Sequence, residues 1–322
     1  MKTIMTTPRI LRVPVIALLP VLAFSLAGQA LAAPPTRTDS TIQGDSEREY
    51  NLKGISQPAG SSVAARDKSG FTVTPPTLRP FDNFGAENAY TIGAGKVAVN
   101  EFFGYGWRQR SGDMVQRTDE FWNIAHTEVK YGILDNLDVK ISISPWNIRT
   151  ETLKDPTGQD SRTRSGFGDL MAGVDWNLWG NAGGPSALRV AATIQLPTAS
   201  EDLKRRDYYA GGLSLQYERQ FPCGFEVRVN SGFMLSESDR GCWNSCFNNR
   251  LVFYHPLIEE LSAYGGFSGG VSTSQRADWE GEFLAGLIYQ INHNFEISLG
   301  STFGVNGDAN DFGIGMGLAI RF

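Results

Sequence analysis

The sequence predicts an all-β protein, a twelve-stranded antiparallel transmembrane β-barrel that follows a signal peptide and a disordered periplasmic segment. Three observations indicate this fold. The last eleven residues alternate between large apolar and small side chains and end on an aromatic residue. The amino-terminus has the charge and apolar pattern of an exported protein. From residue 96 onward, twelve segments of alternating polarity are separated by turn-like sequence.

Residues 312–322 are the most regular of these segments. One face carries Phe312, Ile314, Met316, Leu318, Ile320 and Phe322. The other face carries glycine, alanine and Arg321. Strand side chains point to alternate faces, and an apolar face along a whole membrane-length strand is typical of an outer-membrane barrel. A soluble edge strand is the alternative, but it rarely has six large apolar residues on one face. The segment therefore predicts the closing strand, through which the barrel assembly machinery would contact the chain.

The amino-terminus predicts export. Lys2, Arg9 and Arg12 precede an apolar run over 13–26, and small residues follow at 30–32. This pattern predicts a signal peptide over 1–32. No later run is long and apolar enough for a transmembrane helix, so a membrane-embedded mature chain must form a closed barrel. The predicted location is the outer membrane of a Gram-negative bacterium.

Residues 33–88 lack sustained periodicity and are rich in Pro, Gly, Ser, Thr and charged residues. Such a composition is typical of chain that cannot bury enough apolar surface to fold by itself. We predict a disordered or linker segment in the periplasm, followed by the barrel over 89–322. The alternative is that this segment enters the barrel, because plugged barrels are known.

The twelve predicted strands each combine an apolar and a more polar face. They cover 96–107, 120–131, 137–144, 168–178, 187–196, 208–218, 225–235, 247–255, 261–271, 281–290, 295–303 and 312–322. Twelve is even, as a barrel with both termini in the periplasm requires. Connections after the even-numbered strands are short. The longer, charged connections at 147–166 and 197–207 are therefore predicted as external loops.

Aromatic residues recur at the short-turn end of the predicted strands. They are Tyr131, Trp176, Trp179, Tyr217, Tyr254, Tyr289 and Phe322. Aromatic rings favour the headgroup level of a bilayer, so this pattern predicts an interfacial girdle in contact with outer-membrane lipids.

The inferred inner face carries twelve charged residues of both signs, which we take as candidate lumen-lining residues. They are Arg108, Asp138, Lys140, Asp169, Asp175, Arg189, Glu218, Glu226, Arg228, Glu282, Glu296 and Arg321. Buried charge is tolerated when it is paired or hydrated, so the first interpretation is that ion pairs fill the interior. The second is a selectivity lining in which an unpaired subset steers solutes.

The sequence indicates no catalytic centre. The chain has three His. Only His126 is placed to act as a base, with Ser142 or Ser144 on the next predicted strand as nucleophile. A single His on a barrel strand is more often a hydrogen-bonding residue of the lumen, so we predict that the protein is not an enzyme.

Cys242 and Cys246 lie close together in an external connection and predict a disulfide there, with Cys223 left over. The residues near this loop are too few for a metal site, and no motif predicts a cofactor. The formal net charge is −5, and loss of the predicted signal peptide makes it more negative. This charge excludes a general attraction to nucleic acid.

Five short motifs occur in order along the predicted barrel. They are YTIGAG at 90–95, YGILDNL at 131–137, GFGDL at 166–170, IQLPT at 194–198 and GEF at 281–283. Together they resemble the family of outer-membrane transporters associated with the meta-pathway of phenol degradation. The resemblance covers about 89–322 and implies a β-barrel with a transport role. It implies no catalytic residues and does not extend to 33–88.

The sequence therefore predicts a channel or transporter that passes small-molecule solutes, hydrophobic or aromatic ones included, by passive diffusion. Two alternatives stay open. One is an outer-membrane lipid- or peptide-modifying enzyme. The other is a structural or adhesive barrel that acts through its external loops.

Overall fold

The computed structural model describes residues 87–112, 115–181, 184–203, 209–237, 243–272, 279–306 and 309–322. The predicted signal peptide and all of the predicted periplasmic segment except Glu87 and Asn88 lie outside these residues. Every regular element in the described part is a β-strand. None of the described residues forms a helix with the length and apolarity of a membrane span.

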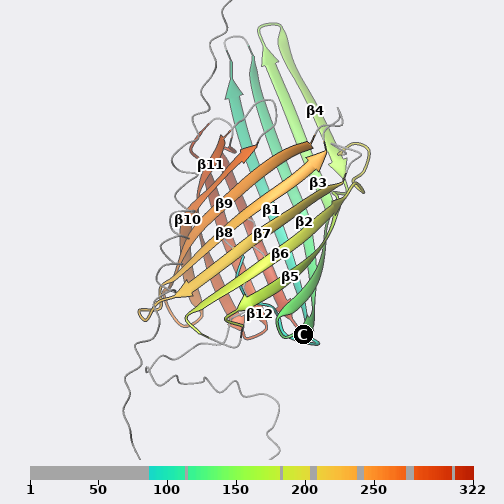
Figure 1. Cartoon of the computed structure of the whole chain (residues 1–322). Coiled ribbons are helices and arrows are strands. Elements are labelled where there is room, and N and C mark those ends of the chain that lie inside the picture. Colours follow the sequence, from blue (N-terminus) through green and yellow to red (C-terminus); the bar gives the residue numbers. More distant parts are fainter. Residues whose placement is uncertain are drawn as a thin grey trace, which may run out of the picture. The chain divides into compact units, whose positions relative to one another are not determined.

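The strands form one antiparallel sheet that closes on itself (Figure 1). They are β1 (Val97–Ser111), β2 (Gln116–Leu134), β3 (Leu137–Asp155), β4 (Gly158–Gly166), β5 (Leu170–Trp179), β6 (Ser186–Leu196), β7 (Ala210–Gln220), β8 (Glu226–Glu237), β9 (Trp243–Pro256), β10 (Leu261–Ser272), β11 (Trp279–Asn292), β12 (Phe295–Gly304) and β13 (Phe312–Arg321). β3 pairs with β5 from Leu137 to Ser142 and with β4 from Asn147 to Asp155. β4 and β5 therefore occupy one strand position in the barrel wall, one after the other. β13 pairs with β1. The prediction of a closed twelve-stranded antiparallel barrel is confirmed.

The outer face of the barrel is apolar, as the alternation predicts. On β13, Ile314 and Met316 are 41% and 40% exposed, whereas Ala319 on the inner face is fully buried. Met316 lies opposite Leu299 of β12 and Phe103 of β1. Side chains opposite one another on one face of a sheet contact each other, so these residues form a continuous apolar surface around the closing strand.

The aromatic girdle is present with one correction. Tyr131, Trp176, Tyr289 and Phe322 are exposed at the short-turn end, as predicted. Tyr254, in contrast, is 2% exposed and lies inside the barrel. The register of β9 turns Phe253 outward in its place, where the Phe253 ring stacks on Phe225.

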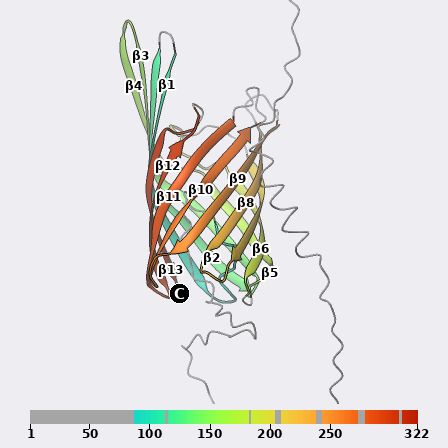
Figure 2. The same cartoon turned by 90° about the vertical axis from the view of Figure 1, so that its left-hand side faces the viewer.

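Two hairpins, β1–β2 and β3–β4, rise above the other strands (Figures 1 and 2). The sequence predicted an external loop over 147–166, but the structure continues β3 to Asp155 and returns it as β4. The exposed hydroxyls of Thr150 and Thr163 are hydrogen-bonded across this hairpin at 3.1 Å. Beyond the lipid a strand needs no apolar face, so this hairpin lacks the alternation by which membrane strands are recognised.

A charge on the lipid face tests the orientation of the closing strand. Met316→Arg is expected to lower the free energy of unfolding by about 2–4 kcal/mol, the cost of a basic residue near the bilayer midplane. Leu257→Arg is the control, because Leu257 lies in the exposed turn after β9. It should cost less than about 1 kcal/mol. Urea unfolding in phospholipid vesicles measures both, and equal costs would contradict the assigned orientation.

Candidate functional site

A network of charged side chains fills part of the barrel interior near the short turns. Its centre is Asp175 of β5, which is fully buried. Its carboxylate lies 2.9 Å from Lys140 Nζ, 3.2 Å from Lys130 Nζ and 3.2 Å from Arg189 Nη1. The three cations come from β3, β2 and β6. Because a buried charge is costly unless it is paired, the three cations and the carboxylate depend on one another.

Residues 87–92, which precede β1, enter this interior, and we call them the lumen segment. The Glu87 carboxylate forms an ion pair with Arg189 and lies 3.9 Å from Lys140 Nζ. Glu87 therefore adds a second carboxylate to the cations around Asp175. Asp175 and Glu87 together face the three cations. A third carboxylate, that of Glu128, lies 3.3 Å from Lys130 Nζ.

Main-chain groups of the lumen segment are held by side chains of the barrel wall. The Ile92 amide donates to Asp138 Oδ2 at 3.0 Å, and the Ala89 amide donates to Glu218 Oε2 at 3.4 Å. The Ala89 carbonyl accepts from Asn177 Nδ2 at 2.6 Å. In a sheet, a neighbouring strand would form hydrogen bonds with these main-chain groups. Here polar side chains of the barrel wall form them. Of the segment 33–88, for which entry into the barrel was the alternative, only Glu87 and Asn88 are described, and Glu87 lies inside.

Ile92 anchors the lumen segment to the closing seam. It packs with Ala98 of β1 and Ala319 of β13, and all three are buried. These small wall residues leave room for the isoleucine side chain, so the segment lies directly against the β1–β13 ladder.

A second cluster lies on the next strands of the wall, β7, β8 and β9. Arg228 pairs with Glu226 and, at 3.2 Å, with Glu218, and its guanidinium lies 4.4 Å from the centre of the Tyr254 ring. Next to it, an apolar cluster of five buried residues contains Val252, Tyr254, Tyr264, Leu284 and Ile288. Ionic and apolar packing together fill the interior at the short-turn end.

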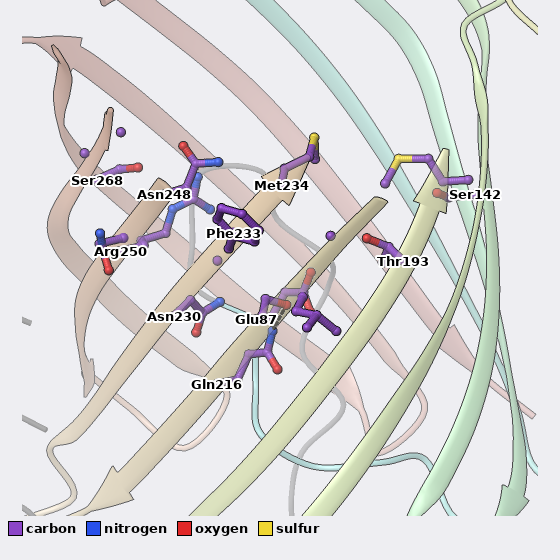
Figure 3. Close-up of a pocket in the computed structure, with 18 of the residues that line it drawn as sticks. Glu87, Ser142, Thr193, Gln216, Asn230, Phe233, Met234, Asn248, Arg250 and Ser268 are labelled. Atoms are coloured by element: carbon purple, nitrogen blue, oxygen red, sulfur yellow. Dashed lines mark hydrogen bonds between the residues drawn. The ribbon is translucent and has the colours of Figure 1, made fainter. Parts of the chain in front are cut away.

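The interior above this packed region is hollow. A cavity of about 540 Å³, which we call the inner cavity, is lined on several strands by polar side chains that include Gln216, Asn230, Asn248 and Arg250 (Figure 3). Glu87 also lines it, beside Gln216 and Asn230. The lumen segment therefore lies at the boundary between the hollow and the packed parts of the barrel.

A second cavity, of about 470 Å³, lies at the base of the tall hairpins, and we call it the mouth cavity. Arg149 and Arg164 line it, together with Asp169. Asp169 accepts hydrogen bonds from Gln195 Nε2 at 2.7 Å and from the Ala199 amide at 2.9 Å. Met234 lines both cavities, so the two are neighbours along the barrel.

The structure places the twelve candidate lumen-lining residues in five surroundings. Eight are buried in the packed interior: Asp138, Lys140, Asp175, Arg189, Glu218, Glu226, Arg228 and Glu296. Glu282 lines the inner cavity, and Asp169 lines the mouth cavity. Arg108 pairs with Asp119 at 3.5 Å in the β1–β2 hairpin. Arg321, next to the last residue, is half-buried.

Three charged residues of the network were not predicted. Lys130 and Glu128 alternate on β2 with the lipid-facing Val129 and Tyr131, so the same alternation could have revealed them. Glu87 could not be found in this way, because it lies before the first strand in a segment without periodicity.

The predicted disulfide stays a prediction. Cys246 lies on β9 and its thiol is free, whereas Cys242 lies outside the described residues. Cys223 is exposed with a free thiol. In the part of the chain that the structure describes, no three His, Cys, Asp or Glu side chains are grouped to hold a metal ion.

The structure brings together His126 and Ser144, a pair considered above for catalysis. His126 Nδ1 lies 2.8 Å from Ser144 Oγ, and Asn123 Nδ2 donates to the same hydroxyl at 3.4 Å. The pairing of β2 with β3 shifts register at this level, between Asn123 and Thr127. Such bulges redirect side chains, which explains why both Asn123 and His126 reach Ser144.

Comparison with known proteins gives one family match. A family model described as "Putative MetA-pathway of phenol degradation" matches residues 79–322. No curated protein matches the sequence.

Solved structures of outer-membrane proteins are similar in fold. An outer membrane channel from Pseudomonas putida F1 has a TM-score of 0.54 at 9% identity, over 76% of this chain and 100% of that chain. The transport unit of the autotransporter AIDA-I from Escherichia coli has a TM-score of 0.44 at 11% identity, over 74% of this chain and 94% of that chain. At these identities the first similarity supports the barrel fold.

The role of the central carboxylate can be tested by its removal. Asp175→Asn is expected to lower the free energy of unfolding by about 3–5 kcal/mol, because it leaves three buried cations with only Glu87 and Glu128 as counter-ions. Asp160→Asn, on the exposed part of β4, is the control and should change it by no more than about 0.5 kcal/mol. Urea unfolding measures both. Equal effects of the two substitutions would contradict the proposed network.

Proposed function

Because the family model covers most of the chain, the protein belongs to the family described as "Putative MetA-pathway of phenol degradation", and we propose that it is a channel for small solutes. It resides in the outer membrane of a Gram-negative bacterium, with membrane lipids against its apolar outer face. The proposed solutes are small hydrophobic or aromatic molecules that cross by passive diffusion. The family description, which refers to phenol, supports an aromatic solute.

The observation that carries this proposal is the hollow part of the barrel. The mouth cavity and the inner cavity are neighbours that share Met234 in their linings, and Glu87 lines the inner cavity. Polar side chains that converge around a cavity of this size are typical of a site for small molecules. The two cavities support a diffusion path from the tall hairpins that is closed by the lumen segment and the packed network below it.

We infer that the lumen segment gates the channel. It is not part of the sheet, and the wall holds it by the Glu87–Arg189 ion pair, by hydrogen bonds to Ala89 and Ile92 and by the packing of Ile92. Breaking these contacts leaves the β1–β13 ladder intact. Displacement of the segment would lengthen the path toward the short turns without opening the barrel wall.

A matched pair of deletions tests the channel and its gate. A variant that lacks 33–92 loses the lumen segment, whereas a variant that lacks 33–86 keeps it. In planar lipid bilayers the first variant is expected to show a larger single-channel conductance than the full mature chain, because the contacts around Arg189 are removed. The second variant should conduct like the full mature chain.

Two outcomes would count against these proposals. If the variant lacking 33–92 folds but passes no current and no solute, the protein is not a channel. If both deletions raise the conductance equally, the gate lies before Glu87 rather than in the lumen segment.

The alternative, an outer-membrane enzyme, has one observation in its favour, the contact between His126 and Ser144. The geometry around it argues for a structural role. Asn123 Nδ2 also donates to Ser144 Oγ, so the serine hydroxyl takes part in a polar hydrogen-bond network of the barrel lining. We therefore propose that this pair is part of the polar lining and that the protein is not an enzyme.

A serine-reactive fluorophosphonate tests this alternative. We expect no covalent labelling of the folded protein, because Ser144 is not an activated nucleophile. Ser144→Ala and His126→Ala should leave solute flux within about twofold of the unmodified protein, because neither residue belongs to the lumen segment that is proposed to close the path. Labelling that disappears in both variants would instead establish a catalytic pair.

We also propose that the barrel assembly machinery contacts the chain through the closing strand. Phe322 is 73% exposed at its end, where a partner can reach it.

A further inference from the structure

The mouth cavity contains a row of three side chains on neighbouring strands. Phe121 of β2 lies opposite Arg149 of β3, and Arg149 lies opposite Arg164 of β4. All three line the same cavity. Residues directly opposite one another in antiparallel strands have their Cβ atoms about 5 Å apart. Two guanidinium groups and an aromatic ring are therefore held side by side on one wall.

Among the described residues, the positive charge of this row is only partly neutralised. Arg149 lies 3.7 Å from Asp119, but Asp119 also pairs with Arg117 at 3.2 Å and with Arg108 at 3.5 Å. Arg164 makes no ion pair with any residue that the structure describes. Two like charges directly opposite in a sheet destabilise it. An anion bound between Arg149 and Arg164 would remove that repulsion.

The acidic residues of the mouth cavity do not fill this role. Asp169 accepts hydrogen bonds from Gln195 and the Ala199 amide and forms no ion pair with an arginine that the structure describes. Asp202 also lines the cavity, but it is exposed to solvent at its rim. The two guanidinium groups thus remain available to a ligand from outside.

Phe121 adds a preference for an aromatic ring in the ligand. Its side chain is 45% exposed although it belongs to the lining of a cavity. An exposed aromatic face beside a guanidinium suits a planar ring that carries an anionic group, because the ring stacks on phenylalanine while the anion accepts hydrogen bonds from arginine. The cavity, about 470 Å³, lies within the range of small-ligand sites.

We propose that the mouth cavity binds aromatic carboxylates, with Arg164 and Arg149 as ligands of the carboxylate and Phe121 as the platform for the ring. This inference rests on the proposed channel function and specifies its solute class. Binding at the entrance holds the solute in the cavity that neighbours the inner cavity at Met234. Asp169 and Asp202 also line the mouth cavity, so the carboxylate is held by direct contact with the two guanidinium groups and not by a net positive charge of the lining.

Ligand titration of the full mature chain in detergent micelles tests the proposal. The probes are benzoate, benzyl alcohol, which has the ring without the charge, and acetate, which has the charge without the ring. Benzoate should bind more tightly than either of the others. Arg164→Gln should weaken benzoate binding by about tenfold or more, the loss expected for a charge-assisted hydrogen-bonded contact. Phe121→Ala should weaken the binding of benzoate but not that of acetate.

Arg162→Gln is the matched control. Arg162 lies on the same strand and is exposed, opposite Glu151 and outside the lining of the cavity. It removes the same charge from the same hairpin and should leave benzoate affinity within about twofold, since an exposed charge is screened by solvent and salt. The urea midpoint should not fall in either variant, because Arg162→Gln changes an exposed residue and Arg164→Gln removes a like-charge repulsion.

The proposal is overturned if benzoate binds no better than benzyl alcohol, or if Arg162→Gln weakens benzoate binding as much as Arg164→Gln. The second outcome would show a diffuse electrostatic field in place of a site. Conductance of the same preparations separates this failure from failure of the channel proposal. A protein that conducts without selective benzoate binding refutes only the site, whereas one that binds benzoate but conducts in no variant refutes only the channel.

Discussion

Closure of the sheet is the constraint on which the rest of this structure depends. Lipid offers no water to an unpaired backbone group, so β1 must pair with β13 from Ala98↔Arg321 to Trp107↔Phe312. In a closed sheet, alternate side chains point into a single enclosed space. Polar residues that the lipid face excludes therefore gather in one interior, and charges such as Asp175 and Arg189 must then pair with each other.

The interior that results is divided along its length. Near the short turns, the ionic network, the apolar cluster around Tyr264 and the lumen segment fill the space. Toward the tall hairpins, glycine and small polar residues leave the two cavities open. The division explains how one barrel can combine a stable, closed base with an accessible entrance. Residues 87–92 are not part of the sheet, so they can be displaced from the closed region without breaking the pairing of any strand.

The fold could be predicted because lipid imposes a simple rule on each strand. β13 and β6 follow that rule over their whole length, and their predicted ranges match the structure within about a residue. The rule fails where lipid is absent. The β3–β4 hairpin needs no apolar face, and it was predicted as a loop. Tyr254 was placed in the girdle because aromatic residues suit both an interface and a packed interior, and only the register of β9 distinguishes the two.

By itself the sequence determined the all-β class, the closed barrel and the inward position of most of its charges, because side-chain alternation is a local property of a strand. Only the tertiary structure decided which charges meet. Asp175 is joined to cations from three other strands, and Glu87 reaches Arg189 from outside the sheet. The mouth row of Phe121, Arg149 and Arg164 likewise depends on the register between three strands. Register and stagger are set by closure of the whole sheet, and no single segment contains that information.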